Sequence, residues 1–235
     1  MRFFLLLFSC LILIGHSPLL SKERRPLSSS LPKPHKKIMP IQLPVKEKQL
    51  IVLDAGHGGT DEGAKVQTFM EKNLTLMTSL LVKKHLLAKG YRVLLTRSRD
   101  QLLTLPERVA AAHRAKADLL ISIHYNAAPS KEAKGIEVFY YNAGEPWRSQ
   151  ASKRLAQSIL REMILSTGAI SRGVKIGNHH LTRESNMPAV LVEGGFITNA
   201  EERSQLRNPA YREKIAEAIA SGIDKYVASI YTRSN

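Results

Sequence analysis

Three short apolar runs, each leading to a side chain that can bind a metal or carry a proton, constrain the fold of this chain most strongly. The runs lead to His57, His124 and Glu193, and the first reaches its histidine through a glycine-rich turn. Short aliphatic runs of this kind are typical of buried strands. Open α/β folds bind ligands at the carboxyl ends of their parallel strands. We therefore expect the three side chains to meet at one edge of a sheet.

A second carboxylate completes a possible ligand set. Glu71 begins the helical pattern that follows His57. Two histidines and one glutamate, with a fourth position open to water, form a known ligand set for catalytic zinc. His57, Glu71 and His124 are therefore candidate ligands of one zinc ion, and Glu193 remains as a candidate general base. Each residue alone also fits a structural role, such as an acid at a helix N-terminus, but the combination favours a site.

Strands and helices alternate along the rest of the chain. Apolar spacing predicts helices over 70–89, 104–116, 145–165 and 208–230, strands over 91–96, 118–124 and 134–141, and a short strand near Leu181. Thr104 and Glu107 predict a capping box at the start of the second helix, and residues 166–178 fit a polar loop. We expect a three-layer α/β/α sandwich around a mostly parallel, twisted sheet of about five or six strands.

The beginning of the chain has the composition of a targeting segment followed by a spacer. Residues 1–21 join a basic start to an apolar run, which predicts a signal peptide or an uncleaved anchor. Residues 22–48 are rich in proline, lysine and arginine, as expected of an extended linker. The catalytic domain is then expected over residues 49–235. This organisation predicts an exported protein of the periplasm or cell envelope.

Positive charge dominates the composition. The formal net charge is +15 at pH 7, and the basic linker is suited to electrostatic contact with an anionic membrane or wall. No aromatic-interleaved basic motif or zinc-finger spacing supports binding to nucleic acid. The only cysteine, Cys10, lies in the targeting segment, so the mature chain would bind a metal through histidine and carboxylate ligands. We expect a monomer.

Five motifs, in order along the chain, carry a family resemblance. They are residues 53–64, 71–74, 95–100, 117–126 and 187–199, the last reading Met-Pro-Ala-Val-Leu-Val-Glu-Gly-Gly-Phe-Ile-Thr-Asn. With them, the chain from about Gln49 to Tyr231 resembles the zinc-dependent N-acetylmuramoyl-L-alanine amidases of the Amidase_3 type. The resemblance implies hydrolysis of the peptidoglycan amide between N-acetylmuramic acid and L-alanine, in wall remodelling or daughter-cell separation.

The resemblance also implies roles for individual residues. It places zinc ligands at His57, Glu71 and His124 and a catalytic residue at Glu193, in agreement with the assignment from spacing. Asn126 and Arg183 are candidate substrate contacts, and Arg183, which is basic and expected near the site, is suited to bind a substrate carboxylate. The chain departs from the usual family pattern at four positions that concern the substrate groove and leave the zinc set intact: His113, Tyr125, His179 and His180.

Two other functions fit the same residues. A zinc peptidase that cuts within the peptidoglycan stem peptide would use similar ligands, and the masses of the products separate it from an amidase. A non-catalytic wall-binding regulator would not need Glu193 as a base, so the presence of this residue favours an enzyme.

Overall fold

The structure is a computed structural model that describes residues 48–231. The predicted signal or anchor segment, residues 1–21, and residues 22–47 of the predicted linker lie outside the described residues. Within residues 48–231, no helix has both the length and the apolar character needed to cross a membrane.

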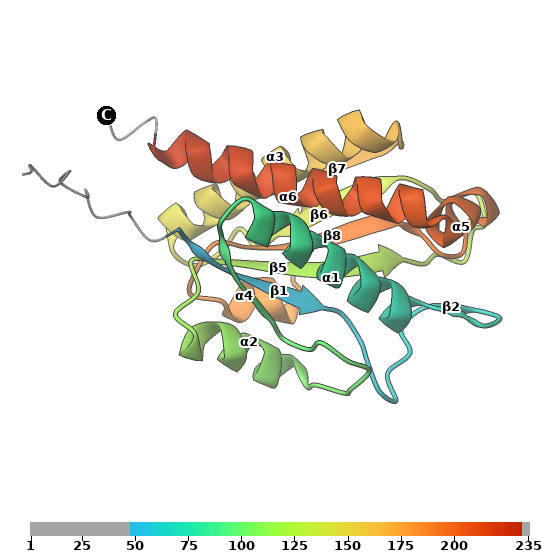
Figure 1. Ribbon diagram of the computed structural model, residues 1–235, viewed down its shortest axis with the longest axis horizontal. Helices are drawn as coiled ribbons and strands as arrows, with labels where there is room; N and C mark the ends of the chain where they lie inside the picture. The colour runs from blue at the N-terminus through green and yellow to red at the C-terminus, as the bar shows by residue number, and fades with distance from the viewer. Residues whose placement is uncertain (1–47, 232–235) are drawn as a thin grey trace, which may run out of the picture. The chain divides into compact units, whose positions relative to one another are not determined.

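A six-stranded mixed sheet forms the middle layer (Figure 1). Across the sheet the strands lie in the order β4 (Arg92–Leu95), β1 (Leu50–Ala55), β5 (Leu119–Asn126), β8 (Ala189–Phe196), β6 (Ile136–Tyr140) and β7 (Ser171–Ile176). The first four strands are parallel, whereas β6 runs antiparallel to β8, and β7 runs parallel to β6. The carboxyl ends of β1, β5 and β8 therefore share one edge of the sheet with the amino ends of β6 and β7.

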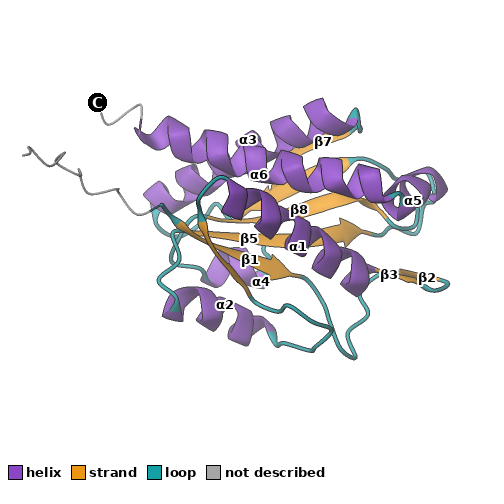
Figure 2. Ribbon diagram, in the orientation of Figure 1, coloured by secondary structure: helices purple, strands orange, loops and turns teal. Residues whose placement is uncertain are grey.

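Helices cover both faces of the sheet (Figure 2). On one face lie α1 (Glu71–Ala88), α3 (Pro146–Thr167) and α6 (Pro209–Tyr231), and on the other lie α2 (Leu105–Arg114) and α4 (His180–Glu184). Because alternate residues of a strand point to opposite faces, Ile121 joins the larger core under α1, α3 and α6, and Leu120 joins the smaller core under α2 and α4.

Two smaller elements complete the described chain. A hairpin of β2 (Lys65–Val66) and β3 (Phe69–Met70) precedes α1, and α5 (Ala200–Arg207) precedes α6. The hairpin brings the chain from the end of β1 back to the start of α1, where Glu71 lies.

The three-layer sandwich expected from the sequence is confirmed. The capping box is present, since the Thr104 hydroxyl accepts a hydrogen bond from Glu107 N and the Glu107 carboxylate accepts one from Thr104 N. The predicted helices and strands, except the short strand near Leu181, end within a few residues of those observed.

Several local predictions are wrong. The segment around Leu181 is not a strand but the short helix α4, in which Arg183 N donates to the carbonyl of His179. Residues 171–176, expected in a polar loop, form the edge strand β7, because charged side chains and Gly173 obscure its strand pattern. The helix α5 was not expected from the sequence, although Asn199 caps it by accepting a hydrogen bond from Glu202 N.

Gly222 allows α6 to pack closely on α3. A Cβ atom at this position would lie 2.5 Å from the Cα of Ile159, and the Gly222 carbonyl accepts a 2.7 Å hydrogen bond from the Ser158 hydroxyl. Because the obstacle is backbone, it cannot rotate away, and a side chain at position 222 would push the two helices apart.

We expect Gly222→Ala to lower the melting temperature by several degrees. Alanine gains about 1 kcal/mol in helix propensity, but overpacking costs about 1–3 kcal/mol, and a backbone obstacle places this site toward the upper end. For a domain of this size, each kcal/mol shifts the melting temperature by about 2–4 °C. Thermal unfolding tests this, with Lys214→Ala on the exposed side of the same helix as the control. An unchanged or higher melting temperature for Gly222→Ala would contradict the packing argument.

Candidate active site

The four candidate residues gather at the carboxyl edge of the parallel strands. His57 follows β1, His124 lies in β5, Glu193 lies in β8, and Glu71 is the first residue of α1. His124 and Glu193 are register partners on adjacent strands, which puts their side chains on the same face of the sheet. The structure thus places the four residues together, as the sequence predicts.

The carboxylate of Glu71 lies between the two histidines. Its Oε1 is 3.0 Å from His57 Nε2 and 3.1 Å from His124 Nδ1, and it accepts a 3.1 Å hydrogen bond from Tyr125 N. Its Oε2 accepts a 2.9 Å hydrogen bond from Ala64 N. Burial alone would raise the pKa of Glu71, but the hydrogen bonds and charges of the two histidines lower this pKa well below its usual range.

A second carboxylate orients His57 from the other side of its ring. Asp61 Oδ2 lies 2.9 Å from His57 Nδ1, so that Nε2 is the nitrogen directed at Glu71. Burial would lower the pKa of His57, but Glu71 and Asp61 together raise it above its ordinary value. A carboxylate on the far nitrogen is the usual support of a metal-binding histidine.

The turn that carries His57 has an unusual backbone conformation. His57 has φ 59°, and the two glycines that follow it have φ 130° and 61°. A non-glycine residue in the left-handed region costs about 1–3 kcal/mol and persists only where its surroundings hold it. We infer that the neighbouring structure stabilises this turn.

Two buried arginines provide that stabilisation. Arg97 donates to the carbonyls of residues 55 and 56 at 2.9 and 2.7 Å, and Arg108 donates to those of residues 55 and 57 at 2.6 and 2.8 Å. Asp54 balances Arg108 through a 2.9 Å ion pair in which both side chains are at most 3 % exposed. The sequence alone indicates no role at the site for either arginine, because arginine is usually exposed. Arg97 stood out in the sequence only because it lies within the family motif 95–100.

Glu193 keeps one buried oxygen without a partner. Its Oε2 accepts no hydrogen bond from any residue of the described chain. Burial, together with the nearby charges of Glu71 and Glu137, raises the pKa of Glu193 well above its usual value. A buried polar atom without a partner is costly, so this oxygen is available to a water or a substrate. The strand does not end here, since β8 continues to Phe196.

The two predicted substrate contacts make local hydrogen bonds. Asn126 Nδ2 donates to Glu137 at 2.6 Å, and Arg183 donates to Glu184 at 2.6 Å and to the Asn178 side chain at 2.8 Å. Neither bonds to the three candidate ligands in the described chain, so their contact with substrate stays a prediction.

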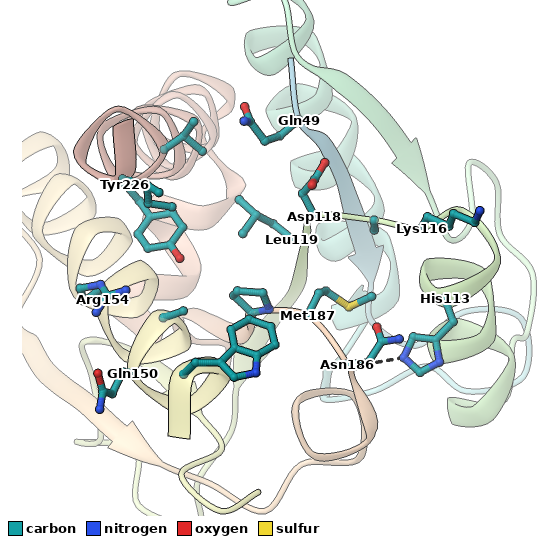
Figure 3. A pocket seen from close by; sticks show the side chains of 16 residues that line it. Gln49, His113, Lys116, Asp118, Leu119, Gln150, Arg154, Asn186, Met187 and Tyr226 are labelled. Atoms are coloured by element: carbon teal, nitrogen blue, oxygen red, sulfur yellow. Dashed lines mark hydrogen bonds between the residues drawn. The ribbon is translucent and has the colours of Figure 1, made fainter. Parts of the chain in front are cut away.

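The structure has hollows at both ends of the parallel strands. One of about 250 Å³ lies beside His57, His124 and α2. A larger one of about 740 Å³ lies at the amino ends of β5 and β8, where Leu119, Met187 and Tyr226 line it (Figure 3). The larger hollow contains none of the four candidate residues. We therefore place the chemistry at the smaller hollow.

The donor set fits a metal ion. One ligand atom each from His57, Glu71 and His124 lies within 4.8 Å of the other two. Two imidazole nitrogens and one carboxylate oxygen are the three protein ligands of several catalytic zinc sites, in which a fourth position stays open. The Asp61 carboxylate behind His57 and the unpartnered oxygen of Glu193 are the further features that such a site needs.

Comparisons with known proteins agree with this geometry. The Amidase_3 family model, described as N-acetylmuramoyl-L-alanine amidase, matches residues 51–225. The chain is 39% identical over 178 residues to the N-acetylmuramoyl-L-alanine amidase LytC of Bacillus subtilis, which covers 76% of this chain but 35% of that longer protein.

Solved structures give the same result. The catalytic domain of the amidase CwlV from Bacillus (Paenibacillus) polymyxa var. colistinus superposes with a TM-score of 0.72 at 36% identity, covering 77% of this chain and 98% of that one. An N-acetylmuramoyl-L-alanine amidase from Clostridium difficile 630 superposes with a TM-score of 0.74 at 34% identity, covering 78% and 99%.

The fold and the site define a hydrolase of the amide class that acts on peptidoglycan. The chain belongs to the Amidase_3 family of N-acetylmuramoyl-L-alanine amidases. A relative from Staphylococcus epidermidis, 35% identical over 189 residues, is described as a probable cell wall amidase, which agrees with the predicted export.

Gly56 offers a direct test of the arrangement. A Cβ atom at this position would lie 2.2 Å from Cε1 of the His124 ring. We expect Gly56→Ala to displace that ring and to lower kcat/KM by about a hundredfold or more, since a shift of about 1 Å in a reacting group can cost that much. Gly222→Ala is the matched control, because it also introduces a clash but lies far from the site, and it should lose stability and keep activity. Full activity of Gly56→Ala on purified peptidoglycan would contradict this geometry.

Proposed function

We propose that this enzyme hydrolyses the amide between N-acetylmuramic acid and L-alanine with one zinc ion held by His57, Glu71 and His124, and with Glu193 as the general base. The observation that carries the proposal is the juxtaposition of three zinc-competent ligand atoms within 4.8 Å and a buried, unpartnered carboxylate oxygen on the adjacent strand. The match of residues 51–225 to the amidase family supports the choice of bond.

Each side chain has a defined task in this proposal. Bound zinc would supply Lewis acidity that activates water and polarises the scissile carbonyl. Glu193 accepts the proton of the attacking water and passes it to the leaving amine of L-alanine. Burial and the neighbouring carboxylates raise the pKa of Glu193, which brings this base closer to the pH at which it must both take and give a proton. Asp61 fixes the ring of His57.

The proposal includes where the enzyme acts and what it meets there. The targeting segment and basic linker predicted for residues 1–48 are consistent with export to the periplasm or cell envelope, where peptidoglycan is the substrate. The positive linker would add electrostatic contact with an anionic membrane or wall surface. We propose that the enzyme works as a monomer, with Asn126 and Arg183 as contacts to the substrate.

The products of peptidoglycan digestion test the choice of bond. We expect purified enzyme to release peptides that begin with L-alanine and to leave intact glycan strands, as mass spectrometry of the soluble fraction would show. A zinc peptidase would instead release fragments cut within the stem peptide. A wall-binding regulator would bind the sacculi and release nothing. Either of these two results would overturn the proposed reaction.

The roles of the ligands and the base are separable by substitution. We expect Glu193→Gln to bind about one zinc per chain and to lose about 10²–10⁴-fold in kcat, because the amide side chain cannot accept a proton. His124→Ala should lose both zinc and activity, since two ligands rarely hold a catalytic metal. Metal analysis and the rate of muropeptide cleavage measure both outcomes. Activity of the original enzyme that survives a strong chelator would show that no metal is needed.

A further inference from the structure

The sheet face that carries His124 and Glu193 continues with a further carboxylate residue. Glu137, on β6, is the register partner of Glu193, and its side chain is 4 % exposed. Its Oε1 accepts a 2.6 Å hydrogen bond from Asn126 Nδ2. Burial would raise the pKa of Glu137, but two cations from β7 lower it. The carboxylate is therefore ionised beside the proposed base.

Both cations share the other oxygen of Glu137. Arg172 Nε donates to Oε2 at 2.9 Å, and Lys175 Nζ donates to the same atom. One cation is enough to balance one carboxylate, so the cluster keeps a net positive charge. Two cations that meet at one oxygen also repel each other. A second anion would relieve this repulsion, and the cluster is therefore suited to bind one.

The two cations remain accessible. The side chains of Arg172 and Lys175 are 35 % and 39 % exposed. Lys175 Nζ has three N–H groups and uses one of them on Glu137. Nη2 of Arg172 has no hydrogen-bond partner among residues 48–231. Unused donors on both heads can therefore meet a ligand without breaking the bonds to Glu137.

A shift in the pairing of β6 with β7 directs the side chain of Arg172 toward Glu137. The pairing of β6 with β7 shifts between Ile136 and Glu137, so that the register passes from Ser171 to Gly173 and leaves Arg172 as the extra residue. Bulges near active sites commonly redirect a side chain in this way. Charged residues on an edge strand also prevent unwanted strand pairing, but that role does not require two cations to share a buried carboxylate.

The distance between the Glu137 cluster and the proposed cleavage site at His124 fits an extended peptide substrate. Glu137 lies two strands from His124, which corresponds to about 10 Å at the usual strand spacing. An extended peptide advances about 3.3–3.6 Å per residue, so the cations would meet a group two to three residues beyond the cleaved amide. In a peptidoglycan stem, the residue after L-alanine carries the first carboxylate that can be free.

We propose that Arg172 and Lys175 bind the first free carboxylate of the stem peptide and so favour stems in which that group is not amidated. The proposal rests on the amidase reaction proposed for His57, Glu71, His124 and Glu193. Glu137, the register partner of Glu193, acts as a positioning residue that holds both cations.

A matched pair of muropeptides tests the proposal. The two substrates differ only in whether the carboxyl group after L-alanine is free or amidated. We expect the enzyme to cleave the free form with a kcat/KM roughly ten- to hundredfold higher, as the loss of a charge-assisted hydrogen bond implies. Lys175→Met and Arg172→Gln should reduce this preference through a higher KM for the free form alone. Loss of the preference in either variant supports the proposal. If the original enzyme shows no preference for the free form, or if both variants keep the preference, the proposal is overturned.

Two control variants separate this site from other cations. Lys225→Met removes an exposed lysine that pairs with Glu162 on the outer helices, and it should keep the preference. Arg183→Gln removes the other basic residue considered for a substrate carboxylate. Loss of the preference in Arg183→Gln, together with its retention in the Lys175 and Arg172 variants, would move the assignment to α4 and overturn this one.

A binding measurement makes the result independent of turnover. Calorimetric titration of Glu193→Gln with the same two muropeptides should show tighter binding of the free form by a similar factor, and Lys175→Met in that background should abolish the difference. Thermal unfolding of each variant checks that the fold is intact. An enzyme that releases no alanine-terminated peptide would refute the proposed function, whereas equal cleavage of both muropeptides would refute only the carboxylate site.

Discussion

Two buried guanidinium groups make the His57 turn possible. The chain at the end of β1 leaves the sheet with its carbonyl groups directed inward, and Arg97 and Arg108 bind those of residues 55–57. Buried charge is tolerated only when it is paired, and Asp54 pairs with Arg108 while it accepts hydrogen bonds from Thr96 and Ser122. The network therefore joins β1, β5, α2 and the residues that follow β4, and it holds the turn in which His57 has its left-handed conformation.

Two carboxylates of the site, Glu71 and Glu193, differ in the hydrogen bonds that they accept. Glu71 accepts hydrogen bonds from the main chain of Tyr125 and Ala64, so it is fixed to β5 and to the loop before the β2–β3 hairpin at the same time. Glu193 has no such donor for its buried Oε2. Against the effect of burial, the two histidines lower the pKa of Glu71, whereas burial and the neighbouring carboxylates raise the pKa of Glu193. Pairs of acids separated in this way commonly mark a fixed anion and a proton carrier.

The sequence predicted the parts of the structure that follow from apolar periodicity and from motifs. The buried strands, the long helices and the grouping of His57, Glu71, His124 and Glu193 fall in this class, since parallel strands that end in polar residues must present them at one edge. The sequence could not reveal the role of Arg108, because its partners at the site, the Asp54 carboxylate and the carbonyls of residues 55 and 57, are far away in the chain. It also missed β7, where the residues that obscure the strand, Arg172 and Lys175, are those that reach the buried Glu137.

The sheet is mostly parallel, as expected from the sequence, and the antiparallel pairing of β6 with β8 brings further residues to the site. Parallel strands can contribute only residues from their carboxyl ends to this edge. Because β6 runs antiparallel to β8, and β7 runs parallel to β6, their first residues arrive there instead. Glu137 and Arg172 are each the second residue of their strand. The reversal therefore places the charged residues Glu137 and Arg172 on strands beyond Glu193, at the same edge of the sheet. A purely parallel sheet would place these positions at the opposite edge, near the larger hollow, where none of the four candidate residues lies.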